Sequence, residues 1–257
     1  ALAIIILRYA KTQTQRIWAG FNTAVSLWAF GTFLASIAKT PDQAIIGWKF
    51  TYLAGNCVTM LFYHLFYTFC QLKKKKILTL IYVQGIFYIP LIAFSNEFIN
   101  STFYFHNSFY YHRATLLYSI FITFVCSTVL LSFSESVKFM KSSQGIQKTQ
   151  AAYLFWGTAL GWAGGATTFL PPYDIPVPIY PAWHFTICIY TFIVTYAIFK
   201  YRLMEISIVI RRGIVYSLLL AILSITYSII VIILENILKE YFRYQSIAIS
   251  ALSAFLL

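Results

Sequence analysis

Charged residues are scarce in this sequence. Only 10% of the 257 residues are Asp, Glu, Lys or Arg, whereas about a quarter are charged in soluble domains. With 60% hydrophobic residues and a mean hydropathy of +0.74, the length of the chain measures membrane spans rather than soluble domains. The seven acidic residues all lie in connections or at the edges of apolar runs. This placement argues against an ion-coupled transporter, which keeps an ionisable group deep in a span.

The residue patterns of catalysis are also missing. The sequence contains no Gly-rich phosphate loop, no nucleophile–base pair and no carboxylate pair. Its four cysteines form no C-x-x-C pair and lie in or beside apolar runs, which is typical of small buried hydrophobic side chains. His106 and His112 are too few to make a metal site by themselves. We therefore expect neither enzymatic activity nor a metal or cofactor in this chain.

Apolar runs long enough to cross a bilayer recur along the chain. A helical span needs about 20 residues, and a continuous apolar run satisfies its backbone groups in lipid as a helix. The sequence therefore predicts an all-α, polytopic membrane helix bundle with seven complete spans and a partial span at each end. The complete spans are expected at residues 17–38, 44–72, 77–95, 114–134, 151–170, 182–199 and 214–234, and the partial ones at 1–7 and 246–257.

Basic residues follow an alternating pattern between these runs. Fourteen of the nineteen Lys and Arg residues lie in every second connection, at residues 8–16, 73–76, 138–148 and 200–212. Basic connections face the cytoplasm, so these four are expected inside. The net charge of +12 is split among connections and does not lie on one face, which argues against a nucleic-acid partner. Because the chain starts and stops inside apolar runs, we expect a longer protein whose continuation is cytoplasmic.

Polar residues form a stripe on the span predicted at residues 44–72. Lys49, Tyr52, Asn56, Tyr63 and Tyr67 follow three- and four-residue steps, and therefore share a helix face. Such a stripe is either one wall of a ligand pocket or a set of hydrogen bonds between helices. If it is a pocket, we expect it in the outer half of the bundle, between the spans predicted at residues 44–72 and 151–170 and under the outer loops 96–113 and 171–183. Its expected lining is Trp48, Tyr52, Asn56, Trp162, Asp174 and Trp183.

Small residues repeat on the span predicted at residues 151–170. Gly157, Gly161 and Gly165 form two overlapping G-x-x-x-G steps, a pattern that lets another helix approach closely. We expect this surface to pack within the chain.

Several segments together resemble a known membrane region. Trp48, Tyr52, Leu53, Gly55 and His64 follow a W…YLG…H pattern, and the loop IPVPIYP covers residues 175–181. The next run ends as YAIFKYRLMEI at residues 196–206, and ISIVIRRGIVYSLL follows at 206–219. The chain in these respects resembles the N-terminal seven-helix membrane region of bacterial sensor histidine kinases. The resemblance implies a sensory region at 1–206, its first helix truncated, and a further helix pair at 207–257 that leads to a cytoplasmic output domain.

The resemblance also implies a function. The region would detect a small or lipid-soluble ligand, or a state of the lipid bilayer, and relay it to a cytoplasmic histidine kinase or another output domain. The parent chain would form a homodimer and phosphorylate a response regulator. The expected relay is the basic turn with Lys200, Arg202, Glu205, Arg211 and Arg212. A transporter or channel is the main alternative, and an enzyme that acts on lipid is a third.

Overall fold

Six α-helices and a short β-hairpin make up the part of the chain that the computed structural model describes, residues 12–105, 109–177, 184–201 and 219. The described residues up to 201 belong to one compact unit, Ile6–Ile206, and Leu219 belongs to a second, Ala1–Ile5 with Ser207–Leu257. The predicted runs at 1–7, 214–234 and 246–257 therefore lie outside the described residues, apart from Leu219.

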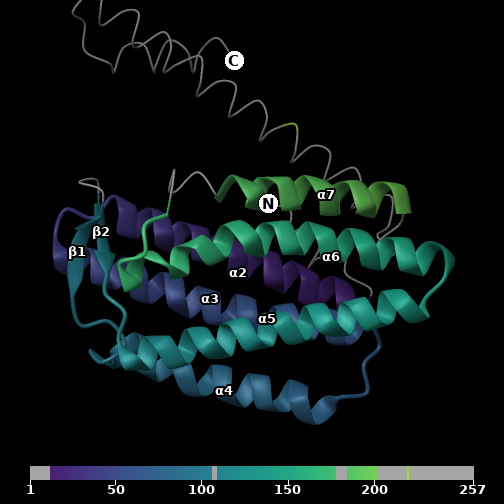
Figure 1. The fold of residues 1–257 in the computed structure, drawn as a ribbon, viewed down its shortest axis with the longest axis horizontal. Helices are drawn as coiled ribbons and strands as arrows, with labels where there is room; N and C mark the ends of the chain where they lie inside the picture. Colours follow the sequence, from purple (N-terminus) through teal and green to yellow (C-terminus); the bar gives the residue numbers. More distant parts are fainter. Residues whose placement is uncertain (1–11, 106–108, 178–183, 202–218, 220–257) are drawn as a thin grey trace, which may run out of the picture. The chain divides into compact units, whose positions relative to one another are not determined.

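The helices follow the predicted apolar runs closely. Most helix ends lie within four residues of the predicted ends. The helices at residues 116–142 and 145–165 extend beyond their apolar runs through Ser, Lys and Gln residues, because these side chains tolerate a helix in water. The helices are α2 (Gln13–Ser36), α3 (Pro41–Phe69), α4 (Lys75–Phe94), α5 (Leu116–Ser142), α6 (Gly145–Gly165) and α7 (Phe185–Tyr201) (Figure 1).

Threonine caps fix the start of three helices. The Thr12 hydroxyl accepts a hydrogen bond from the Gln15 backbone N–H, and the Thr12 backbone N–H donates to the Gln15 side-chain Oε1, which makes a capping box. Thr40 caps α3, which continues with Pro41 in its first turn. Thr115 caps α5 in the same way. These caps satisfy backbone donors where each helix leaves a loop.

Helix α3 is central, because it packs against α2, α4 and α5. Its contact with α2 is very close: a Cβ atom built on Gly47 would lie 2.6 Å from the Ala35 backbone nitrogen. One built on Gly31 of α2 would lie 2.7 Å from the Thr51 nitrogen. Only glycine at these two positions permits so short a separation of the helices.

A β-hairpin follows α4, which the sequence did not predict. Strand β1 (Thr102–Phe105) pairs antiparallel with β2 (Phe109–His112), with Thr102 opposite His112. The structure is therefore mostly helical rather than all-α. The hairpin lies in the aromatic connection at residues 96–113, and aromatic residues favour strands. Two short 3₁₀ turns, η1 (Ala166–Phe169) and η2 (Pro171–Tyr173), follow α6.

Three described helices, α2, α4 and α5, are long and apolar enough to cross a membrane. The prediction of seven complete spans is therefore not confirmed. Helices α3 and α6 have the length, with 29 and 21 residues, but α3 carries Lys49, Asn56 and His64 among its apolar residues. Among the described residues of α7, Phe185–Val194 forms a shorter apolar segment. Large apolar side chains on α4, such as Leu80 and Phe87, are exposed on the bundle surface, as lipid contact requires.

Candidate functional site

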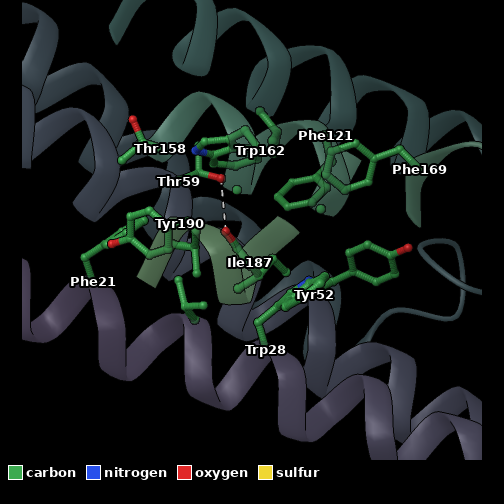
Figure 2. A pocket seen from close by; sticks show the side chains of 16 residues that line it. Phe21, Trp28, Tyr52, Thr59, Phe121, Thr158, Trp162, Phe169, Ile187 and Tyr190 are labelled. Carbon is green, nitrogen blue, oxygen red and sulfur yellow. Dashed lines mark hydrogen bonds between the residues drawn. The ribbon is translucent and has the colours of Figure 1, made fainter. Parts of the chain in front are cut away.

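A cavity lies between α2, α3, α5, α6 and α7 (Figure 2). Its empty space, including the open mouth, is about 680 Å³. Aromatic side chains lie at both ends of it. The lining residues are Phe21, Val25, Trp28, Tyr52, Gly55, Val58, Thr59, Phe121, Val125, Thr158, Gly161, Trp162, Gly165, Phe169, Ile187 and Tyr190.

Helical spacing explains how these side chains converge. Phe21, Val25 and Trp28 lie four and three residues apart on α2, so they point to one side of the helix. On α3, Tyr52, Gly55 and Thr59 repeat the same steps. Each helix thus turns one narrow stripe toward the space between them.

The polar groups of the cavity wall are few and mostly engaged. The Thr59 hydroxyl donates to the Gly55 carbonyl oxygen over 3.0 Å, the dashed line in Figure 2. The Thr158 hydroxyl donates to the Leu154 carbonyl oxygen over 2.7 Å. No Asp, Glu, Lys, Arg or His is among the described residues that line the space. The cavity therefore suits an uncharged, mostly apolar molecule.

Tyr52 connects the cavity to a buried polar network under the hairpin. The Nδ1–H of His112 donates to the Arg113 carbonyl oxygen (3.2 Å), so Nε2 is the acceptor for the Tyr52 hydroxyl at 2.7 Å. The Tyr118 hydroxyl lies 3.1 Å from that of Tyr52. Burial disfavours the charged imidazole and lowers the pKa of His112 to about 3, although the bond to Arg113 opposes this shift. His112 is therefore neutral.

The hairpin and the 3₁₀ turns are joined at this end of the bundle. The Tyr111 hydroxyl donates to the Thr168 carbonyl oxygen over 2.8 Å, next to Phe169 in the cavity wall. The Arg113 guanidinium contacts the Asp174 carboxylate at 2.8 Å, and both side chains are more than half exposed. An exposed pair of this kind contributes about 0–1 kcal/mol, so the buried Tyr111 contact matters more for the attachment.

The structure brings two of the six expected pocket residues into the cavity wall, Tyr52 and Trp162. Trp48 is buried beneath the hairpin, where its indole donates to the Tyr110 carbonyl oxygen over 3.0 Å. Asn56 faces α4 and donates to the Gly85 carbonyl oxygen over 2.7 Å. Asp174 is exposed, in its ion pair with Arg113. Trp183 lies outside the described residues.

Two glycines of the predicted packing surface face α7. A Cβ atom on Gly157 would lie 3.1 Å from the Val194 side chain, and one on Gly161 would lie 3.2 Å from Tyr190 Cβ. A Cβ atom on Gly165 would have nothing within 4 Å. The stripe therefore contacts α7 through its first two members, and the third borders the cavity.

Charged residues gather at the opposite end of the bundle from the hairpin. The Glu135 side chain, only 5% exposed, contacts Lys74 at 2.9 Å and Lys138 at 3.0 Å, which ties the α3–α4 connection to α5. Of the expected relay residues, Lys200 donates to the Tyr196 hydroxyl over 2.6 Å. Arg202, Glu205, Arg211 and Arg212 lie outside the described residues.

The histidines of the described part serve in other contacts. His64 pairs with the Tyr82 hydroxyl at 2.7 Å, between α3 and α4, and His184 packs edge-on against Trp28. Among the described residues, no three His, Cys, Asp or Glu side chains are placed to hold a metal ion. His106 lies outside the described residues.

Most aromatic residues of the cavity wall escaped the sequence analysis. Phe21 and Trp28 on α2, Phe121 on α5, Phe169 on η1 and Tyr190 on α7 all line it. Their only signal is the seven-residue step from Phe21 to Trp28, which places both on one face of α2. In a chain with 19% aromatic residues, such a step has little weight.

The comparisons with known proteins agree with the membrane reading of these helices. No curated protein and no solved structure matches the sequence. A family model described as the N-terminal 7TM region of histidine kinase matches residues 1–207. Together with the apolar helices, this match makes the chain an integral membrane protein whose matched region is non-catalytic. The chain belongs to the family of N-terminal seven-helix membrane regions of histidine kinases.

Proposed function

We propose that the chain senses a lipid-soluble ligand in the cavity and relays its presence to a cytoplasmic histidine kinase domain. One observation carries the proposal: the cavity is apolar, and five different helices line it, with α7 among them. A molecule that fills this space contacts all five helices at once. Its binding therefore favours one arrangement of the bundle over another wherever the two arrangements fit it differently.

Helix α7 is the element that would transmit the change. Ile187 and Tyr190 reach the cavity from its first half. One turn further on, Val194 packs on Gly157 of α6. At the far end of α7, the Gln150 side-chain amide donates to the Tyr201 carbonyl oxygen over 2.8 Å. A ligand beside Tyr190 thus acts on a helix whose other end leads into the basic turn.

The basic turn with Lys200, Arg202, Glu205, Arg211 and Arg212 would lie on the cytoplasmic side of a bacterial inner membrane. Residues 207–257 would add a helix pair before the output domain. Dimerisation through the parent chain and transfer to a response regulator would complete the pathway.

The test fills the cavity without disturbing the helix contacts. Gly165→Leu places a side chain where a Cβ atom meets nothing within 4 Å, so it occupies the space that a ligand would use. Ala163→Leu, on the exposed side of the same helix, is the matched control. Autophosphorylation of the full-length protein in lipid vesicles, with and without a lipid extract of the host, is the measurement.

We expect Gly165→Leu to fix the kinase output and abolish its response to the extract, while Ala163→Leu responds like the wild type. Equal responses of the two variants would contradict the proposal. Solute flux into vesicles that contain the wild-type protein would instead favour the transporter alternative.

A further inference from the structure

Two tryptophans in the cavity wall have indole donors that pair with no acceptor among the described residues. Trp28 on α2 and Trp162 on α6 are both half-buried. An indole N–H can only donate, and a buried one usually finds an acceptor, as Trp48 does with the Tyr110 carbonyl oxygen. Within the described part of the chain, neither the Trp28 nor the Trp162 indole N–H has a hydrogen-bond partner.

The N–H edge of the Trp28 indole faces Gly55, which has no side chain to cover it. A Cβ atom built on Gly55 would lie 3.4 Å from Trp28 Cδ1 and 3.9 Å from its Nε1. The N–H edge of this indole therefore rests over the glycine, and both residues border the cavity.

Trp162 supplies a second donor at another depth. Its ring lies 5.4 Å from that of Phe62. Because Gly55 and Phe62 are seven residues apart on α3, the two indoles contact α3 at points about 10 Å apart along the helix axis. A ligand with one hydrogen-bond acceptor can therefore pair with one indole at a time. An elongated ligand with two acceptors can pair with both indoles.

The rest of the wall determines what the acceptor can be. The hydroxyl protons of Thr59 and Thr158 are already donated to carbonyl oxygens of their own helices. The described wall contains no cationic side chain, so a carboxylate or phosphate would be buried there without a counter-ion. A hydrocarbon would fill the space but leave the indole donors unpaired.

We infer that the ligand is an uncharged, lipid-soluble molecule with a carbonyl oxygen, such as a ketone, ester or quinone, that accepts a hydrogen bond from Trp28 or Trp162. This inference rests on the proposed function, since it names the ligand class of the same cavity. The aromatic walls would hold the apolar body, and the indole donors would select the carbonyl group.

Tryptophan indole signals report directly on this bond. The full-length protein, labelled with ¹⁵N-tryptophan in lipid nanodiscs, would be titrated with two carbonyl compounds, a straight-chain methyl ketone and tetralone. The alkane with the same number of carbons and tetralin are the matched hydrocarbons. Trp156 lies on α6 with 63% of its surface exposed, so its signal shows what simple partition into the bilayer does. Trp→Phe variants assign the three signals.

We expect the carbonyl compounds to move the indole signal of Trp28 or Trp162 downfield and to saturate, while Trp156 changes little. The variants Trp28→Phe and Trp162→Phe keep the aromatic surface but lose the donor. The variant of the shifted residue should bind the carbonyl compound about two- to tenfold more weakly and bind the hydrocarbon unchanged. Trp156→Phe should bind both like the wild type.

The outcomes separate this inference from the proposed function. Equal, saturable binding of ketone and hydrocarbon would overturn the carbonyl assignment and leave the apolar ligand site in place. Absence of saturable binding by all four compounds would overturn both. A shift that follows Trp156 would show partition into lipid only, and would likewise overturn the inference.

Discussion

Single residues decide how the polar groups of the bundle are satisfied. The stripe on α3 was open to two interpretations, a pocket wall or contacts between helices. In the structure its members divide: Tyr52 borders the cavity, whereas Asn56 donates to Gly85 on α4. His64, also on α3, forms a hydrogen bond with Tyr82, which lies on α4 like Gly85. One helix face can therefore hold both kinds of residue, because it is broad enough to meet the cavity and a neighbouring helix.

The neutral state of His112 gives the buried polar network under the hairpin a pH dependence. The unfolded histidine has a pKa of about 6.5, and the folded one about 3. Between these values the unfolded state binds the extra proton, so the free energy of unfolding falls as the pH falls below about 6.5, by up to about 1.4 kcal/mol per pH unit. Above that pH the stability is fully present.

We therefore predict that the protein in mild detergent has a lower unfolding temperature at about pH 5.5 than at about pH 7.5. His112→Gln keeps an acceptor for Tyr52 but has no ring to protonate, and should lose most of this difference. If the variant keeps the full pH dependence, another group is responsible.

At the scale of the elements, glycine controls the contact between α2 and α3. A Cβ atom on Gly47 would meet the Ala35 backbone at 2.6 Å for N and 2.8 Å for Cα. Backbone atoms cannot turn aside as a side chain can, so the helices must separate. Overpacking of this kind costs about 1–3 kcal/mol.

We predict that Gly47→Ala lowers the free energy of unfolding by about 1–2 kcal/mol, because the gain in helix propensity offsets part of the overpacking. Gly165→Ala is the matched control, since its Cβ atom would meet nothing within 4 Å, and should change the stability by less than about 0.5 kcal/mol. Thermal unfolding of both variants in the same detergent measures the difference. Equal stabilities would show that α2 and α3 separate at little cost.

The whole bundle has two chemically different ends. In Figure 1 the hairpin lies at one end, and the α3–α4 and α5–α6 connections lie at the other. The second end contains Lys74, Glu135 and Lys138, and the first contains Arg113 with Asp174. The basic α3–α4 and α5–α6 connections, which the sequence predicts on the same side of the membrane, thus lie together at one end of the described bundle.

We predict opposite accessibility for cysteines placed at the two ends. Ile175→Cys, at the hairpin end, should react with a membrane-impermeant maleimide in intact spheroplasts. Lys75→Cys, in the lysine run, should react only after the cells are opened. Both side chains are exposed on the protein, so burial does not confound the comparison, and the wild type gives the background of the four natural cysteines. The reverse pattern would contradict the predicted orientation.

The sequence by itself determined the helices, because an apolar run of about 20 residues has one way to satisfy its backbone groups in lipid. It also determined the family, since the family model matches residues 1–207 from the sequence alone. Threonine caps set the starts of α2, α3 and α5, and each start lies within a few residues of the prediction.

Only the tertiary structure decided which side chains share a space. Trp48 and Tyr52 are one helical turn apart, yet one is sealed under the hairpin and the other borders the cavity. Trp28 and Tyr190 line the same cavity from helices far apart in the sequence, and no local sequence pattern encodes this proximity. The hairpin over Trp48 was equally hidden, since its cross-strand pairs form only when residues of one loop fold back on each other.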